Sequence, residues 1–207
     1  MTTTYIERKY VLDTYDNIAR EFSHTRFHIW NFVKHFLSDK GSLYGLDIGC
    51  GNGKNMIHDS MVGVDCNQFF LDICKSRWKE VFYSDCCNLS FRSNIFDYCM
   101  CISVVHHLSS NERRIKCVME MIRVMKSGAN GVFNVWSLEN QEKRRFVLGD
   151  NYVEWKSRDS NKKTQLRYYY IMDYATFMKF VNNFKNLIDM IKIENEKGNW
   201  VVYFVKK

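Results

Sequence analysis

The feature that most constrains the fold is a glycine-rich turn directly after a short apolar run. The stretch from residue 46 to residue 53 reads LDIGCGNG, with glycines at alternate positions after an acid. The apolar run that ends at Ile48 predicts a buried strand, and a helix is expected to follow near Lys54. Glycine lets the backbone approach a ligand closely, and the N–H groups of such a turn can face that ligand. The sequence therefore predicts a ligand site at a strand–turn–helix junction.

The acid before the glycines narrows the class of ligand. Dinucleotide enzymes use G-x-G-x-x-G to hold a pyrophosphate. Here Asp47 precedes glycines at positions 49, 51 and 53, and its charge repels pyrophosphate but suits a cationic amino or sulfonium group. The pattern resembles motif I of class I S-adenosylmethionine (SAM) methyltransferases. The alternative is a tight turn without a ligand, which the signals on the following strands make less favoured.

The totals limit the class of protein. The 207 residues suffice for one domain with a sizeable core, and 46% of them are hydrophobic. No apolar run approaches the roughly 20 residues that span a bilayer, and residues 1–9 lack a signal-peptide core. The eight cysteines form no C-x-x-C pair, so we expect reduced thiols and a cytoplasmic or nuclear location. A net charge of +7 permits an anionic partner.

Strands and helices alternate along the chain. Hydrophobic spacing predicts helices over residues 5–22 and 174–184, and a further helix that begins after Arg26 and ends at about Leu37. Two more helices are expected, one after Asn67 and one after a capping box formed by Ser109 and Glu112. Trp78 is expected on the apolar stripe of the helix after Asn67. Further strands are expected at 61–65, 81–83, 96–105, 132–136, 187–193 and 200–205. Residues 137–172 lack regularity, and the part from 142 to 168 holds eight Lys or Arg against four acids.

This alternation predicts an α/β fold with a seven-stranded, mostly parallel sheet and helices on both faces. We expect one domain over residues 1–207, with an N-terminal helical cap over 5–38 and a substrate-binding insertion over 137–172. In the class I methyltransferase (Rossmann-like) fold that the chain resembles, the strand order is 3-2-1-4-5-7-6, with strand 7 antiparallel.

Two further acids follow predicted strands. Asp65 ends the second strand, 14 positions after Gly51, where a carboxylate can accept both ribose hydroxyls of a nucleoside. Asp85 follows the third strand, where it could accept from an adenine amino group. Each acid alone is more often a helix cap or a solvated loop residue, but the two together favour a nucleoside site.

Segments outside the glycine motif narrow the family. The stretches YDNIA at 15–19, FS-x-TR at 22–26, NVWSLE at 134–139, V-x-WK at 153–156 and RYY at 167–169 resemble the eukaryotic tRNA wobble-uridine carboxyl methyltransferases. These enzymes esterify 5-carboxymethyluridine to the 5-methoxycarbonylmethyl form. The short segment 55–60 departs from the usual helix after motif I.

The resemblance implies roles for individual residues. A carboxylate nucleophile needs little general-base help, so the implied catalytic residues, Arg26, His106 and Arg167, would hold and orient it. His107 is expected to point away by side-chain alternation. Each has a structural alternative, such as a helix cap, a packed histidine or an edge strand. The implied cofactor-binding residues are Tyr15, Asp47, Gly49, Cys50, Gly51, Asp65, Cys66, Asp85, Cys86 and Ser103. The implied substrate-binding residues are Trp136, Lys143, Arg144, Arg145, Tyr168 and Tyr169.

The resemblance also implies partners. These are the tRNA anticodon loop and a small zinc-binding activator protein that would pair with the edge strand at 81–85, giving a heterodimer. No metal site is expected in this chain and no membrane contact. Two other functions stay open at this point: a SAM-dependent methyltransferase for a small molecule, and a catalytically silent methyltransferase-like binding subunit.

Overall fold

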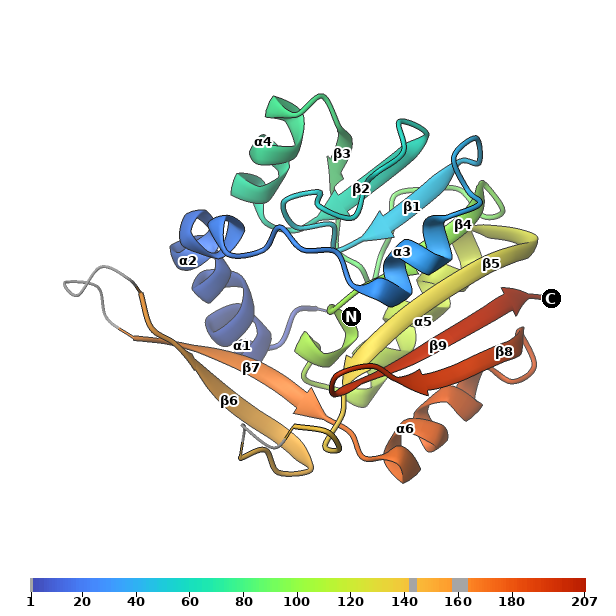
Figure 1. The fold of residues 1–207 in the computed structure, drawn as a ribbon. Helices are drawn as coiled ribbons and strands as arrows, with labels where there is room; N and C mark the ends of the chain where they lie inside the picture. The colour runs from blue at the N-terminus through green and yellow to red at the C-terminus, as the bar shows by residue number, and fades with distance from the viewer. Residues whose placement is uncertain (1, 142–144, 158–163) are drawn as a thin grey trace.

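The computed structural model describes residues 2–141, 145–157 and 164–207, and its main element is a seven-stranded sheet (Figure 1). The strand order is β3-β2-β1-β4-β5-β9-β8, and a second sheet pairs β6 with β7. The strands are β1 (Gly45–Ile48), β2 (Met61–Asp65), β3 (Glu80–Tyr83), β4 (Phe96–Cys101), β5 (Met125–Trp136), β6 (Gly149–Trp155), β7 (Gln165–Ile171), β8 (Ile188–Asn195) and β9 (Asn199–Lys206).

The predicted topology is confirmed. The strands β3, β2, β1, β4 and β5 pair in parallel, and β9 runs antiparallel to both β5 and β8. Once the separate β6–β7 sheet is set aside, β8 and β9 are the sixth and seventh strands of the main sheet. The arrowheads of β1 and β2 in Figure 1 point toward α2, so the carboxyl ends of these strands face the N-terminal helices.

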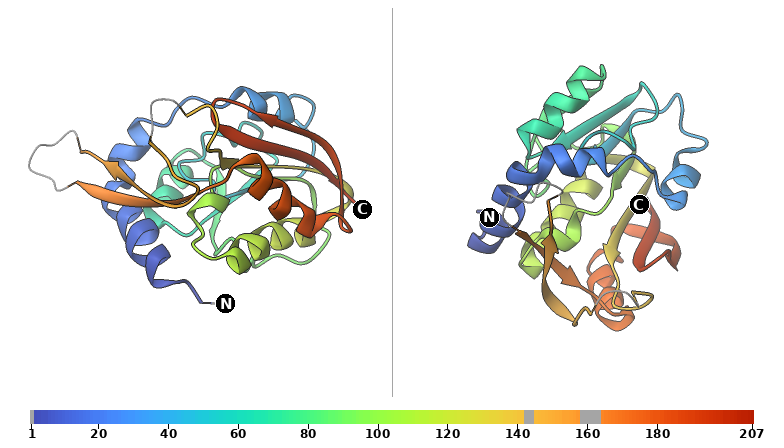
Figure 2. Two further views of the ribbon diagram at one scale, coloured as in Figure 1. Left: turned by 90° about the horizontal axis from the view of Figure 1, so that it is seen from below. Right: turned by 60° about the vertical axis from the view of Figure 1, so that its left-hand side comes forward.

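Helices cover both faces of the main sheet (Figure 2). Along β4, Tyr98 and Met100 join one buried cluster with α3, while Cys99 and Cys101 join another with α5 and α6. This alternation is what a strand buried on both faces should show. The helical elements are α1 (Tyr5–Glu7), η1 (Arg8–Leu12), α2 (Asp13–His24), α3 (Asn31–Leu37), α4 (Gln68–Ser76), η2 (Val105–His107), α5 (Asn111–Val124), α6 (Tyr174–Val181) and η3 (Asn182–Phe184).

The helix expected near Lys54 is absent. Residues 49–60 form turns and irregular backbone between β1 and β2. Contacts with distant residues hold this segment: His58 Nε2 lies 2.9 Å from the Leu37 carbonyl, and the Lys79 side chain donates to the Met56 carbonyl. Three glycines with positive φ occupy its first half, so too few residues remain for a stable helix.

Two local predictions around α4 and α5 are wrong. The helix α4 ends at Ser76, and Trp78 adopts a left-handed φ of 59° with 97% of its surface exposed. The N-cap of α5 is Ser110 rather than Ser109, since the Ser110 hydroxyl accepts from the Arg113 N–H. In both places the sequence pattern correctly predicted a helix, but the end of α4 and the start of α5 differ from the prediction by one or two residues.

The predicted lapse of regularity after residue 137 is also wrong in part, because β6 and β7 form an antiparallel hairpin there. Figure 1 shows this hairpin beside the N-terminal helices. Thr14 Oγ1 donates to the Leu166 carbonyl, and the Tyr10 and Tyr152 rings lie 4.8 Å apart between centroids. The hairpin and the N-terminal helices therefore pack together beside the carboxyl ends of the parallel strands (Figure 1).

All eight cysteines carry free thiols, in agreement with the prediction of reduced thiols. A search of the described helices finds none with the length and apolar character needed to cross a membrane.

Candidate active site at the carboxyl ends of the strands

The glycine turn after β1 brings backbone close to an open space. Gly49, Gly51 and Gly53 have φ values of 71°, 54° and 70°. A Cβ on Gly49 would lie 2.2 Å from Val104 Cγ2, and one on Gly53 would lie 2.8 Å from Cys74 Sγ. A Cβ on Gly51 would meet nothing within 4 Å. Packing therefore requires the outer two glycines, whereas Gly51 borders space that a ligand could enter.

When ionised, Asp47 carries an unmatched charge beneath this turn. Its side chain is fully buried, and neither carboxylate oxygen has a hydrogen-bond partner among the described residues. Burial, followed by the neighbouring Asp65, raises the pKa of Asp47 to about 7. Burying an ionised carboxylate without a partner costs free energy, so the site of Asp47 favours a cationic ligand that would pair with it.

Asp65 sits at the end of β2 and fastens the turn. One carboxylate oxygen accepts from the Gly51 N–H at 2.8 Å and the other from the Asn67 N–H at 2.9 Å. Burial raises its pKa, while these backbone donors act in the opposite direction. Asn67 in turn donates to Asp16 of α2 at 2.6 Å. Beside these acids, Cys50 is buried and Cys66 is exposed.

Asp85 and its neighbours follow β3. Asp85 Oδ1 accepts from the Cys87 N–H at 2.9 Å, and Arg113 Nη2 approaches Oδ2 at 3.3 Å. The ligand atoms of Asp85, Cys86 and Cys87 lie within 4.8 Å of one another. The adjacent Arg113 guanidinium disfavours a metal cation there, and the predicted absence of a metal site stays a prediction.

A second group of predicted residues gathers after β4. His106 is fully buried in η2, its Nδ1 accepts from the Trp136 N–H at 3.1 Å, and its Nε2 has no partner among the described residues. Burial lowers the pKa of His106, so the ring is neutral and carries its proton on Nε2. Trp136 stacks on Tyr169 with 3.9 Å between ring centroids. Ser103, at φ 62°, donates its N–H to the Asn134 side chain at 2.8 Å.

His107 does not point away, contrary to the prediction. Its Nδ1 lies 2.8 Å from the Tyr168 carbonyl and its Nε2 lies 3.2 Å from the Tyr15 hydroxyl. Strand alternation fails here because β4 ends at Cys101 and residues 105–107 form a 3-10 turn. Burial lowers the pKa of His107 to about 4, so this histidine is also neutral and joins the N-terminal helix to the hairpin.

Arg167 carries the opposite unmatched charge. It is 6% exposed, its Nη1 donates to the Tyr169 hydroxyl at 2.9 Å, and its Nε is buried without a partner. Among the residues that the structure describes, no ion pair joins Arg167 to an acid. Its guanidinium lies 5.3 Å from the ring centroid of Trp155, whose Nε1 is also buried without a partner in the described part of the chain.

Arg26 lies beyond the end of α2, with its guanidinium 4.7 Å from the Phe22 ring centroid. Asn52, to which the sequence analysis assigns no role, donates to the carbonyl oxygens of Arg26 and Ser23 at 3.0 and 3.3 Å. Asn52 therefore joins the glycine turn to the chain that carries Arg26. Asn52 is buried, and its partners lie 26 and 29 positions earlier, so no local sequence pattern points to this role.

The remaining residues predicted to bind substrate do not lie together in the structure. Tyr168 is fully buried, and its hydroxyl donates to Asp150 at 2.6 Å. This side chain therefore packs inside the hairpin. Arg145 is exposed, while Lys143 and Arg144 fall outside the described residues.

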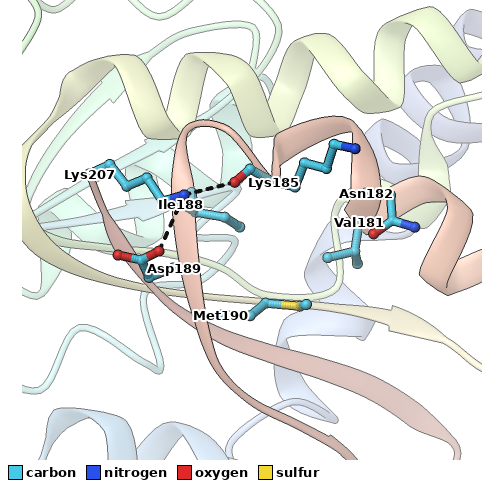
Figure 3. A pocket seen from close by; sticks show the side chains of 7 residues that line it. All are labelled: Val181, Asn182, Lys185, Ile188, Asp189, Met190 and Lys207. Atoms are coloured by element: carbon cyan, nitrogen blue, oxygen red, sulfur yellow. Dashed lines mark hydrogen bonds and ion pairs between the residues drawn. The ribbon is translucent and has the colours of Figure 1, made fainter.

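A hollow of about 180 Å³ opens at the other end of the sheet (Figure 3). It lies between α6, η3 and β8, and contains none of the predicted site residues. Its lining comprises Val181, Asn182, Lys185, Ile188, Asp189, Met190 and Lys207.

Comparisons with known proteins agree with the observed fold. Residues 46–133 match the family model described as a methyltransferase domain. The solved structure of a methyltransferase in complex with the Trm112 activator, from Haloferax volcanii, superposes with a TM-score of 0.68 at 13% identity, covering 95% of this chain and 97% of that one. A SAM-dependent methyltransferase from Clostridium acetobutylicum gives a TM-score of 0.66 at 13% identity, covering 90% and 98%. At such low identity these likenesses show the fold alone.

Curated relatives are more similar in sequence. The chain is 40% identical over 144 residues to tRNA (carboxymethyluridine(34)-5-O)-methyltransferase alkbh8 of Xenopus tropicalis, covering 67% of this chain and 23% of that protein. It thus spans about a quarter of that relative's length. The tRNA (carboxymethyluridine(34)-5-O)-methyltransferase of Schizosaccharomyces pombe is 37% identical over 158 residues, covering 72% of this chain and 68% of that protein. The chain therefore belongs to the tRNA (carboxymethyluridine(34)-5-O)-methyltransferase family.

Proposed function

We propose that this chain transfers a methyl group from SAM to the carboxylate of 5-carboxymethyluridine at the wobble position of tRNA. The observation that carries the proposal is a pair of buried charges of opposite sign that the described residues leave unmatched. Asp47 lies beneath the glycine turn, and Arg167 lies in the hairpin beside Tyr169. One suits a cationic cofactor and the other a carboxylate substrate.

The residues around the glycine turn fit SAM. Asp47 would pair with a positively charged group of the cofactor, and the open space at Gly51 leaves room for a ligand against the backbone. Asp65, placed at the end of β2, would accept from the ribose, and Asp85 from the adenine amino group. When bound, SAM supplies an electrophilic methyl group on a sulfonium sulfur.

The residues of the hairpin and of η2 fit a carboxylate. A carboxylate with a pKa near 4 is ionised at neutral pH, so the site needs to orient it rather than deprotonate it. Arg167 Nε and His106 Nε2 are buried nitrogens without partners in the described structure, so each has a donor to offer. Arg26, near the glycine turn, would add a second positive charge at the mouth of the site. Holding the carboxylate with few donors avoids stabilising the ground state too strongly.

The proposed partners follow from charge and from the sheet edge. A net charge of +7 suits tRNA, and the exposed Arg145 belongs to the basic stretch that would face it. The edge strand β3 pairs only with β2 in the sheet and exposes Phe82 and Tyr83. An unprotected edge of this kind can accept an added strand. We propose that a small zinc-binding activator protein adds that strand.

The proposal is tested with labelled SAM and tRNA that carries 5-carboxymethyluridine. The chain is co-expressed with its activator, and a matched tRNA carries the neutral amide, 5-carbamoylmethyluridine. We expect base-labile label on the carboxylate tRNA only, because a methyl ester hydrolyses in base. Arg167→Met should retain SAM binding and lose most of the transfer.

Other outcomes would overturn the proposal. Label that resists base, or equal label on both tRNAs, would exclude esterification of the carboxylate. SAM binding without transfer to either tRNA would favour a small-molecule substrate. The absence of SAM binding in the complex would leave a silent binding subunit.

A further inference from the structure

A buried ion pair joins the N-terminal helix α1 to helix α5 beside the candidate site. Glu7 and Arg113 are each 3% exposed, and Arg113 Nε donates to Glu7 Oε2 at 2.7 Å. Glu7 ends α1 and Arg113 lies in the first turn of α5, 106 positions later. Two charges buried at this depth are retained only when each is well compensated, so the pair fixes α1 against α5.

The second oxygen of Glu7 strengthens this attachment. Glu7 Oε1 accepts from the Ser109 N–H at 2.8 Å and from its hydroxyl at 3.2 Å. Thr4, which caps α1 by accepting from the Glu7 N–H, also contacts the Ser109 hydroxyl at 2.6 Å. The start of the helical segment 5–24 is therefore anchored to the loop before α5.

Arg113 extends the link to an acid of the proposed cofactor site. Its Nη2 lies 3.3 Å from Asp85 Oδ2 and 3.4 Å from Oδ1, longer than its contact with Glu7. The Asp85 side chain is 38% exposed. Glu7 thus takes the close contact with the guanidinium, and Asp85 keeps carboxylate surface available for a ligand.

The same helical segment reaches the rest of the site. Tyr15 contacts His107, and Asp16 accepts from Asn67, whose backbone N–H binds Asp65. A segment that touches both halves of the site can transmit a binding event from one to the other when its docking is linked to a ligand.

We propose that Glu7 and Arg113 are positioning residues that couple docking of the segment 5–24 to occupancy of the adenine end of the cofactor site at Asp85. The inference rests on the proposed function for the assignment of Asp85. Without the Glu7 charge, Asp85 balances a larger share of the Arg113 charge and is drawn toward it. Cofactor binding then weakens, and the bound cofactor no longer orders the segment 5–24.

The test compares Glu7→Gln with Asp13→Asn, a control that removes one exposed acid from the same segment. S-adenosylhomocysteine affinity is measured by calorimetry, and amide exchange of residues 5–24 is followed with and without it. In the unmodified chain we expect the ligand to slow exchange. In Glu7→Gln we expect about 5- to 20-fold weaker binding and no slowing of exchange. Asp13→Asn should match the unmodified chain.

A second variant separates positioning from stability. In Glu7→Gln/Arg113→Gln both charges are removed, so the fold should tolerate the change better than the loss of one partner. We expect the double variant to regain thermal stability while the ligand still fails to slow exchange. If the pair had only a structural role, the double variant would regain the ligand-induced slowing of exchange together with its stability.

Besides recovery of the coupling in the double variant, two results would overturn the inference. Glu7→Gln with unmodified affinity and full ligand-induced slowing would overturn it alone. If the unmodified chain failed to bind S-adenosylhomocysteine or SAM, the proposed function would fall and the inference with it.

Discussion

At the residue scale, the site contains ionisable groups whose charge state the fold has altered. Asp47 is buried beside Asp65, and its pKa is raised to about 7. His106 and His107 are buried beside each other, and the pKa of each is lowered. Perturbed groups of this kind gather at functional sites more often than elsewhere. The raised pKa of Asp47 predicts a pH dependence of stability, whereas the lowered pKa of His106 predicts an effect on the rate that does not change with pH.

The first prediction concerns the stability of the ligand-free protein. The raised pKa of Asp47 means that the folded state binds this proton more tightly than the unfolded state, whose carboxyl has a pKa near 4. The free energy of unfolding should therefore fall as pH rises from about 4 to about 7. Asp47→Asn should remove that part of the slope and stabilise the ligand-free protein by about 2–4 kcal/mol at pH 8.

Denaturant unfolding of both proteins at pH 5 and pH 8 checks this prediction. Asp65 contributes a slope in the same direction, so only the difference between the two proteins reports on Asp47. Equal differences at the two pH values would contradict it. The same variant should bind SAM weakly, because the neutral amide no longer matches a cationic ligand.

The second prediction concerns His106. Because burial keeps the ring neutral, His106→Phe should lower the methyl-transfer rate by a factor that is the same at pH 6 and pH 8. Loss of an orienting donor costs up to about 100-fold when a reacting group is misplaced. Single-turnover rates at saturating SAM measure this factor. A factor that changed tenfold between the two pH values would mean that His106 titrates in that range.

At the element scale, the sequence predicted the strands better than the connections between them. The bounds of β2 match the predicted strand 61–65 because a buried parallel strand reads as an uninterrupted apolar run. The prediction of a helix after the glycine turn is wrong because tertiary contacts fix this segment, from Lys79 to the Met56 carbonyl and from His58 to the Leu37 carbonyl, and no local pattern reveals them. The β6–β7 hairpin was missed because polar residues fill its buried positions: Asn151 is buried in β6, and Arg167 is buried in β7 beside Tyr168 and Tyr169.

The third prediction concerns the turn between β1 and β2. Gly51→Ala and Gly128→Ala both place a side chain at positive φ, with no atom within 4 Å of the added Cβ. Each should lose about 1–2 kcal/mol of stability from the left-handed backbone. Only Gly51→Ala should lose SAM affinity, because its Cβ would enter the proposed ligand space.

Thermal unfolding and SAM titration of the two variants test this difference, with Gly49→Ala as a third case. Its Cβ would overlap the Val104 side chain, so it should lose more stability than either. If Gly51→Ala bound SAM as the unmodified chain does, the cofactor would not approach the backbone at this position.

At the scale of the whole molecule, the strand order could be predicted because the alternation of strands and helices resembles a known fold. The acids proposed for the cofactor half each follow or end a parallel strand, so their meeting at one edge of the sheet could also be expected. The substrate half depends on which distant segments meet. Tyr168 and Tyr169 are adjacent, yet one packs inside the hairpin and the other stacks on Trp136. The Glu7–Arg113 pair joins residues that no spacing rule connects. Such pairings are set by the packing of the cap and the hairpin, so only the structure could supply them.

The last prediction concerns the two open edges of the main sheet. On β3, Tyr83 is 64% exposed, and on β8, Ile191 is 62% exposed, so the pair offers matched sites for substitution by lysine. The β8 edge carries a register shift near Ile191 and charged neighbours, both of which discourage strand addition. The β3 edge has no register shift and exposes Phe82 and Tyr83, so an activator protein should add its strand there. Tyr83→Lys should weaken complex formation by at least about tenfold in a pull-down or by calorimetry, and Ile191→Lys should not. The reverse pattern would place the partner on β8, beside the hollow lined by Met190 and Lys207.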